Sequence, residues 1–186
     1  MKFRLHAFEP FRRANRPGLR AVVWFQGCTL GCPGCFNLAT HDSQAGRHAD
    51  TESLAAEILA LGTRIEGIPI SGGEPFQQPD ALLDLLSRLT NSLLSRLVFS
   101  GYSLADIHRL PLGPSILRHI DVLIAGRYVA SQQPWPRPPG FGEPANSPAN
   151  RALHGAATNQ CSSSRGDFHG NGTVTATGIS PWRPEL

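Results

Sequence analysis

The pattern of apolar and polar positions over the first 130 residues predicts an α/β fold. Residues 21–25 form an unbroken apolar run, which is typical of a strand buried on both faces of a parallel sheet. Shorter apolar runs predict further strands at residues 68–71, 97–100 and 120–124. Helical patterns lie between these strands, so the order of elements is that of strands joined by helical crossovers.

Two longer helices and one short helix are predicted between the strands. The first begins at Asp50 or Thr51 as its N-cap and carries apolar residues at i, i+4 and i+7 until Gly62 ends it. The second begins at Pro79, in a first-turn position that tolerates proline. Its predicted buried stripe consists of Leu82, Leu83, Leu86, Leu89, Leu93 and Leu94. A short helix is expected over residues 104–110.

The regular pattern does not continue through the whole chain. Repeated prolines between positions 134 and 148 exclude a helix or a central strand, so we predict a proline-rich loop or lid over residues 131–166. Further on, Asn171-Gly172 lies between β-forming residues, which is the strongest short-range signal for a hairpin. We therefore expect a core of residues 1–130 and, after the proline-rich segment, a C-terminal β-hairpin and tail over residues 167–186.

Length and charge narrow the class of protein. With 186 residues the chain is shorter than the about 250 residues of a closed eight-stranded α/β barrel, so we expect an open partial (β/α) barrel. No apolar stretch approaches the about 18 residues that span a membrane, and no apolar segment follows the basic amino terminus, so we predict neither membrane insertion nor export. The net charge is only +3 and the arginines are scattered, which argues against nucleic-acid binding.

Three cysteines directly after the first predicted strand are the main candidates for chemistry. Cys28, Cys32 and Cys35 have the spacing C-x3-C-x2-C, and no fourth cysteine follows closely. Three thiolates on a [4Fe-4S] cluster leave one iron open, whereas a structural zinc site normally closes with a fourth ligand. The glycines and the proline between the cysteines favour a loop. Such clustered thiols indicate a reducing, cytoplasmic compartment, and Cys161 is most simply a bystander.

A second group of candidates lies at the ends of the next two strands. Gly72 and Gly73 lack Cβ atoms, so their backbone is able to approach a ligand closely and to offer carbonyl acceptors to an ammonium group. Glu74 adds a carboxylate, and Ser100 adds a hydroxyl at the end of the following strand. Phe36, beside the last cysteine, offers a flat apolar surface for an adenine ring.

Simpler interpretations stand beside these. A zinc knuckle completed by His41 or His48 also accounts for three cysteines, although it does not explain the glycine turn. Glu74 is also a suitable first-turn acid before a proline, and Ser100 a suitable turn former. Phe36 taken alone is more often a core residue.

In their order and spacing, these motifs resemble the radical S-adenosylmethionine superfamily. The resemblance is strongest to the small activating enzymes of glycyl-radical proteins, and among those to activators of anaerobic ribonucleotide reductase. It is carried by residues 16–20, by residues 24–27, by the run Cys35-Phe36-Asn37 and by the Gly-Gly-Glu-Pro turn. It covers residues 4–128 well and the rest of the chain poorly.

The resemblance implies a [4Fe-4S] cluster on the three cysteines, with S-adenosyl-L-methionine chelated at the open iron. An electron passed through the cluster cleaves the sulfonium to a 5'-deoxyadenosyl radical, so the cofactor rather than a side chain abstracts hydrogen. The expected cofactor-binding residues are Gly34, Phe36, Gly72, Gly73, Glu74 and Ser100. One departure is Ala125, because these activators usually carry an acidic residue there, just before the glycine.

The resulting hypothesis is an iron-sulfur oxidoreductase that places a glycyl radical on a partner protein such as anaerobic ribonucleotide reductase. A flavodoxin-like protein is the expected electron donor, since a mildly cationic surface suits an acidic donor. The alternatives are a small-molecule radical enzyme of the deazapurine synthase type and a non-catalytic iron-sulfur or zinc-binding module.

Overall fold

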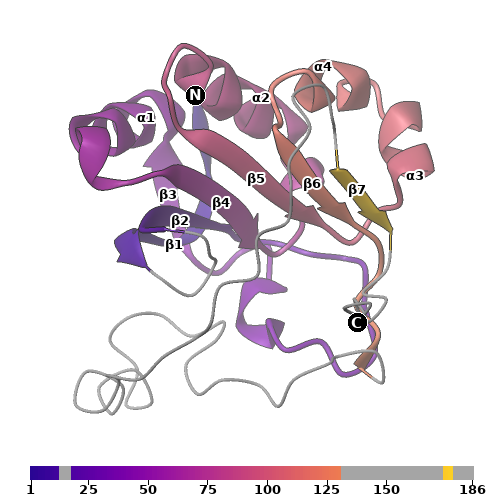
Figure 1. Ribbon diagram of the computed structural model, residues 1–186. Coiled ribbons are helices and arrows are strands. Elements are labelled where there is room, and N and C mark those ends of the chain that lie inside the picture. The colour runs from indigo at the N-terminus through magenta and orange to yellow at the C-terminus, as the bar shows by residue number, and fades with distance from the viewer. Residues whose placement is uncertain (13–17, 131–173, 178–186) are drawn as a thin grey trace, which may run out of the picture.

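The computed structural model describes residues 1–12, 18–130 and 174–177. Within these residues a seven-stranded sheet has the order β3-β1-β2-β4-β5-β6-β7, and helices cover one of its faces (Figure 1). The strands are β1 (Lys2–Arg12), β2 (Arg20–Phe25), β3 (Arg47–Asp50), β4 (Gly67–Gly72), β5 (Ser95–Ser100), β6 (Val122–Ala125) and β7 (Val174–Thr177). The α-helices are α1 (Thr51–Ala60), α2 (Pro79–Leu89), α3 (Leu104–Arg109) and α4 (Gly113–Leu117). Short 3-10 turns are η1 (Leu38–Thr40), η2 (Gly62–Arg64) and η3 (Pro75–Gln77).

The centre of the sheet is parallel, as the pattern of strands and helices predicts. β2, β4, β5 and β6 pair in parallel in that order, whereas β1 pairs antiparallel with β2 and with β3. All six residues of β2 are buried, which explains its continuous apolar run. The sheet does not close on itself, because β3 and β7 lie at opposite ends of the strand order. The predicted open α/β fold is therefore confirmed.

The helix stripe on α2 forms much of the core, but the prediction extended it too far. Leu82, Leu86 and Leu89 are fully buried, whereas Leu93 is fully exposed because the helix ends at Leu89. Two hydroxyl groups form hydrogen bonds with the last turn of the helix. Thr90 Oγ1 donates to the Leu86 carbonyl at 3.1 Å and Ser92 Oγ to the Leu89 carbonyl at 2.7 Å. These hydroxyls satisfy carbonyls that a longer helix would have bonded internally.

Three elements have no counterpart in the predictions. β1 and β3 form the antiparallel side of the sheet, and α4 is a single short helix of five residues. β1 escaped detection because most of its positions are only partly buried and its pairing with β2 is interrupted by two register shifts. α4 begins with Gly113-Pro114, which reads as a turn in sequence.

Several predictions fall outside the part of the chain that the structure describes. These are the proline-rich loop over residues 131–166, the Asn171-Gly172 turn of the predicted hairpin, and Cys161. Of the C-terminal segment the structure describes β7, which pairs in parallel with β6 at the edge of the sheet. Among the described residues no helix is long and apolar enough to cross a membrane.

Charged and polar side chains tie the strands together at the amino end of the parallel sheet. At the start of β2, buried Arg20 donates from Nη1 to Ser95 Oγ at 2.7 Å, linking that strand to the start of β5. Arg96 binds both carboxylate oxygens of Asp121 at 2.8 and 2.9 Å. Side-chain hydrogen bonds therefore link the strands at this end of the sheet. The candidate residues for chemistry lie at the other end.

Candidate metal centre and cofactor site

Four chain segments meet beyond the carboxyl ends of β2, β4, β5 and β6. The hydrogen-bonding pattern of the sheet continues past the strands: Gly73 N–H donates to the Phe25 carbonyl at 2.8 Å and Glu74 N–H to the Gly27 carbonyl at 2.9 Å. On the other side, Gly126 N–H donates to the Ser100 carbonyl at 3.0 Å. The cysteine segment, the glycine turn and the exits of β5 and β6 are therefore held in register with one another, at the edge where such sheets bind ligands.

Gly72, the last residue of β4, and Gly73 after it are required by contact between backbones. A Cβ atom added to Gly72 would lie 2.3 Å from the Phe25 carbonyl oxygen, and one added to Gly73 would lie 2.2 Å from the Gly27 carbonyl oxygen. Gly72 also has a φ of +107°, which favours glycine. The close approach expected at these glycines is thus, in this structure, an approach to the backbone of the cysteine segment. Their contact with a cofactor remains a prediction.

The three cysteines lie on an irregular loop after β2, as predicted. All three are free thiols of intermediate burial. A turn joins the second to the third, because the Cys35 N–H donates to the Cys32 carbonyl at 3.1 Å. Gly31 and Gly34 adopt φ values of +62° and +70°, so the loop follows a path that other residues rarely adopt.

Each of the three sulfurs has an N–H donor beside it. The donors are the Leu30 amide for Cys28, Arg127 Nη1 at 3.9 Å for Cys32 and, in the tautomer with hydrogen on Nε2, His41 at 3.4 Å for Cys35. Burial raises the pKa of the Cys28 thiol, and the hydrogen bond from Leu30 offsets part of this rise. Nearby negative charges, including that of Glu74, act in the same direction as burial. A bound metal or a cation is the natural way to keep this thiol ionised.

The donor set fits an iron-sulfur cluster better than a single zinc ion. Among the residues that the structure describes, no three side chains of His, Cys, Asp or Glu converge as one metal ion requires. Each cysteine of a cluster binds its own iron, so the sulfurs need not meet at one point. His41 lies beside Cys35, but His48 lies on β3, paired with Arg4 of β1. The positions of these side chains therefore do not support the zinc-knuckle alternative.

Glu74 ties the glycine turn to the exit of β5. Its side chain is 1% exposed, and Oε1 accepts hydrogen bonds from Phe76 N–H at 3.0 Å and Ser100 Oγ at 2.9 Å. Oε2 accepts from Gly101 N–H at 2.7 Å. Burial raises the pKa of this carboxyl, against the lowering effect of these bonds and of the nearby Arg127 charge. The carboxylate also caps η3, so the first-turn interpretation describes its geometry, and its contact with a cofactor remains a prediction.

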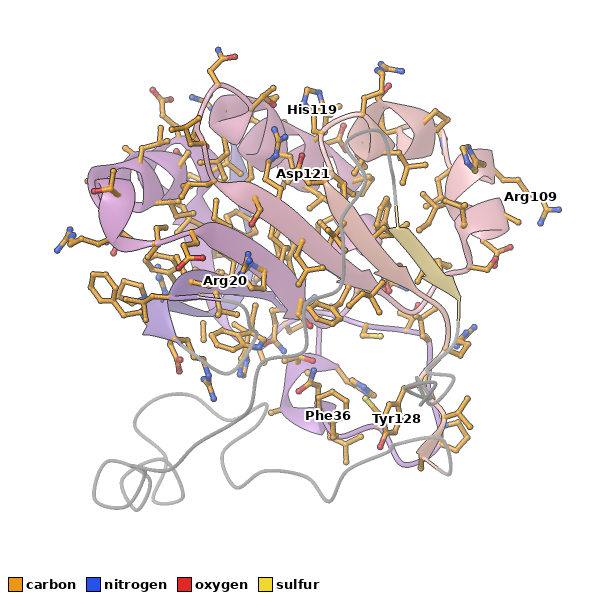
Figure 2. The ribbon with its side chains drawn as sticks, viewed as in Figure 1. Arg20, Phe36, Arg109, His119, Asp121 and Tyr128 are labelled. Carbon is orange, nitrogen blue, oxygen red and sulfur yellow. The ribbon has the colours of Figure 1, made fainter. Side chains whose placement is uncertain are left out.

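The other predicted cofactor residues lie around the same edge. Ser100 is buried and pairs across the sheet with Ala125, which is also buried, so this end of β6 offers no acidic side chain. Phe36 packs edge-to-face on Tyr128, with ring centroids 5.1 Å apart (Figure 2). Gly34 faces the β6 exit, since a Cβ added there would lie 3.2 Å from Ala130 Cβ. The structure thus brings all six predicted residues to one edge without testing their roles.

Sequence reasoning missed two side chains that organise the site. Gln77 accepts from Thr29 N–H at 3.0 Å and donates to Thr29 Oγ1 at 2.8 Å, and it also donates to the Tyr102 hydroxyl at 3.2 Å. Asn37 is buried and donates to the Gly72 carbonyl at 3.3 Å. Gln77 comes three residues after Glu74 and nothing in the local sequence marks it. Asn37 belongs to the motif that carries the family resemblance, which was the available signal.

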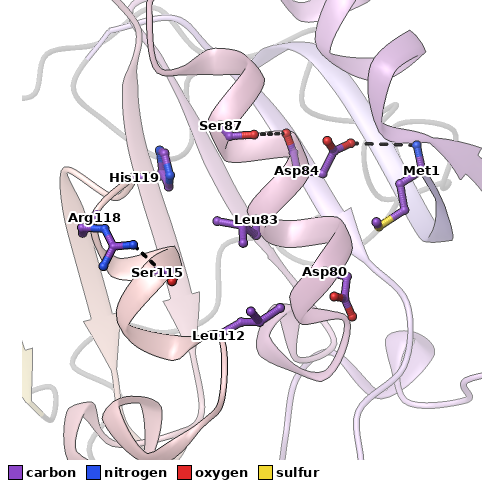
Figure 3. Close-up of a pocket in the computed structure, with 9 residues that line it drawn as sticks. All are labelled: Met1, Asp80, Leu83, Asp84, Ser87, Leu112, Ser115, Arg118 and His119. Atoms are coloured by element: carbon purple, nitrogen blue, oxygen red, sulfur yellow. Dashed lines mark hydrogen bonds and ion pairs between the residues drawn. The ribbon is translucent and has the colours of Figure 1, made fainter.

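A pocket of about 520 Å³ lies away from this edge, between α2 and the segment around α4 (Figure 3). Its lining includes Asp84 on one side and Arg118 and His119 on the other. Asp84 is already engaged, because it pairs with Arg88 at 3.0 Å and accepts a hydrogen bond from Thr51. Cys28, Cys32 and Cys35 are not among the described residues that line this pocket, so it is separate from the candidate site.

Comparison with known proteins agrees with this geometry. The family model described as 4Fe-4S single cluster domain matches residues 14–139. The anaerobic ribonucleoside-triphosphate reductase-activating protein of Vibrio cholerae is 30% identical over 135 residues, which cover 68% of this chain and 85% of that protein. The pyruvate formate-lyase-activating enzyme of Clostridium pasteurianum is 29% identical over 126 residues, which cover 65% of this chain but only 50% of that enzyme.

Among solved structures, the crystal structure of QueE from Escherichia coli matches with a TM-score of 0.48 and 17% identity, over 67% of this chain and 70% of that chain.

Proposed function

The chain belongs to the radical S-adenosylmethionine family of glycyl-radical-enzyme activating proteins, and from this premise we propose that it activates a partner of the anaerobic ribonucleotide reductase type. The observation that carries the proposal is the loop of three free cysteines, held in register with the exits of β4, β5 and β6. A ligand set of three thiolates suits a cluster with one open iron.

The chain's own residues bind and position the reacting groups. Cys28, Cys32 and Cys35 would hold the [4Fe-4S] cluster, and the glycine turn fixes their loop against β4. With S-adenosyl-L-methionine bound and an electron from an external donor, the cluster would supply the radical chemistry that activates the partner's glycine. Phe36 and Tyr128 form an aromatic surface beside the cysteine loop that suits an adenine ring. No side chain of this protein needs to abstract hydrogen.

The remaining assignments follow from the same premise. We assign cofactor contacts to Gly34, Phe36, Gly72, Gly73, Glu74 and Ser100, which lie around one edge of the sheet. A flavodoxin-like protein is the proposed electron donor, since the net charge of +3 suits an acidic partner. The clustered free thiols support a reducing, cytoplasmic compartment.

Anaerobic reconstitution followed by cofactor cleavage tests the chemistry. We expect about four irons per chain and release of 5'-deoxyadenosine when a reductant is added. Replacing any one of Cys28, Cys32 or Cys35 by alanine should abolish cluster binding, whereas Cys161→Ala is the matched control and should retain it. Stoichiometric zinc without iron, or loss of the cluster in the control, would contradict the assignment.

A second measurement identifies the partner. The reduced, cofactor-loaded protein is mixed with an anaerobic ribonucleotide reductase or with a pyruvate formate-lyase from the same source. Electron paramagnetic resonance should show a glycine-centred doublet with the first partner. A doublet only with the pyruvate formate-lyase would show that the protein activates that enzyme instead. Cofactor cleavage with neither doublet would favour a small-molecule substrate.

A further inference from the structure

Arg127 is a cation that reaches back from the exit of β6 to the cysteine loop. Its Nη1 group donates to the Leu30 carbonyl and lies 3.9 Å from Cys32 Sγ. The neighbouring residues fix its position, because Gly126 N–H donates to the Ser100 carbonyl and Tyr128 packs on Phe36. The segment after β6 therefore holds the guanidinium against the cysteine loop. The residues directly before and after Arg127 are fixed by contacts of their own.

No carboxylate forms a close ion pair with Arg127 among the residues that the structure describes. The ion pairs of that part of the chain engage Arg12, Arg88, Arg96, Arg109 and the amino terminus. Two carboxylates, Glu74 and Asp106, interact with Arg127 over a longer range. The oxygens of Glu74 are occupied by Ser100 and two backbone amides, and Asp106 is engaged by Ser103 and Arg109. The residue before Gly126 at the end of β6 is Ala125, which carries no charge.

The three cysteine sulfurs consequently differ in their surroundings. Cys28 has a neutral backbone donor and Cys35 an imidazole, whereas Cys32 has a guanidinium. Arginine stays protonated at every pH at which the protein is folded, so its charge is permanent. Hydrogen bonds to the sulfurs and net charge are the protein's main means of setting the reduction potential of an iron-sulfur cluster.

We propose that Arg127 raises the reduction potential of the cluster by placing a fixed positive charge and an N–H donor at Cys32. The inference rests on the proposed function, since it requires a cluster on the three cysteines. Reduction adds one electron, supplied by an external one-electron donor, and increases the negative charge on the cluster and its thiolates. A nearby cation stabilises this reduced form more than the oxidised form. Arg127 is thus a positioning and tuning residue and takes no part in bond breaking.

The experiment is a redox titration of the reconstituted protein without S-adenosyl-L-methionine, followed by electron paramagnetic resonance of the reduced cluster. Arg127→Met keeps the length of the side chain but removes its charge and donors, and Arg127→Lys keeps the charge without the planar fork. At a fixed solution potential near the wild-type midpoint, we expect the ratio of reduced to oxidised cluster to fall about tenfold in Arg127→Met, as loss of one charged hydrogen bond predicts. Arg127→Lys should lie between that variant and wild type.

The matched control is Arg118→Met. Arg118 is exposed, donates to Ser115 Oγ at 3.2 Å and lines the pocket away from the cysteine loop, so its removal should leave the midpoint unchanged. Omitting the cofactor ensures that an effect on cofactor binding is not mistaken for an effect on the cluster. A midpoint equal to wild type in Arg127→Met would overturn the inference, and so would an equal shift in the control.

Two further outcomes separate this inference from the function on which it rests. A wild-type protein that takes up no iron would refute the proposed function itself. If Arg127→Met fails to hold a cluster, Arg127→Gln replaces it, because glutamine is polar but uncharged and its amide is too short to take the place of Nη1 at Cys32. A wild-type midpoint in Arg127→Gln would then show that the charge does not tune the cluster.

Discussion

The helix-covered face of the sheet and the loops at its carboxyl edge are stabilised by different kinds of contact. Beneath α2, aliphatic side chains such as Leu82 and Leu86 are completely buried, and apolar packing supplies the stability. At the carboxyl edge, a glutamine, a buried glutamate and two glycines join the loops through hydrogen bonds and backbone contacts. The comparison teaches that folding and organisation of the metal site depend on separate sets of residues.

The two regions should also differ in how they respond to substitution. A cavity among aliphatic side chains is partly filled by relaxation of its neighbours, so its effect is graded. Two backbones in contact at a glycine have no flexible side chain that could move aside. The loops are therefore expected to be sensitive to single added atoms.

The largest change in stability is expected in the helix-covered core. Leu86→Ala removes a fully buried side chain from α2, and we expect it to lower the free energy of unfolding by about 2–5 kcal/mol. Leu93→Ala is the matched control, since Leu93 is fully exposed, and its effect should stay within about 0.5 kcal/mol. Urea unfolding measures both values. Iron bound per folded chain should be unchanged in both variants, and a loss in Leu86→Ala alone would show that the two regions are coupled.

The second prediction concerns the carboxyl edge. In Gly73→Ala the new Cβ would lie 2.2 Å from the Gly27 carbonyl oxygen, so the cysteine loop must shift. We expect a loss of about 1–3 kcal/mol, typical of overpacking, together with a marked loss of reconstituted iron. Gly62→Ala is the control: its φ of +56° adds strain, but nothing lies within 4 Å of the new atom. Full iron content in Gly73→Ala would show that the turn does not position the cysteine loop.

The parallel core and the cysteine loop were predictable because their signals are local. A fully buried strand has a continuous apolar run, as β2 does, and glycine or proline beside closely spaced cysteines favours a loop. β1 could not be recognised in the same way, because it is an irregular strand with only two buried positions, Phe3 and Leu5. Leu93 was misassigned because periodicity alone does not show where hydroxyl side chains end a helix.

The contacts that organise the site could not be predicted from sequence. Gln77 and Thr29 are separated by 48 positions, and Arg127 and Cys32 by 95. Such pairs depend on the order of strands in the sheet, which brings the exits of β2, β4 and β6 to one edge. The residue types did not indicate a role in the site either, since glutamine and arginine are common on protein surfaces. The motifs therefore indicated the candidate ligands, and the fold shows which side chains hold their loop.

The smallest expected effect is a pH dependence that comes from Glu74 and distinguishes this buried carboxyl from those on the surface. Burial raises its pKa in the folded state above the about 4.3 of an exposed glutamate. Between these two pKa values the folded state binds more protons than the unfolded state, so this contribution to stability is fully present at low pH and is lost as the pH rises through the window. In Glu74→Gln the contribution is absent, and the loss of one hydrogen-bond acceptor adds only a pH-independent offset. Urea unfolding of both proteins should therefore show a stability advantage of wild type that shrinks as the pH rises from about 4, and a constant difference would show that the pKa of Glu74 is not raised.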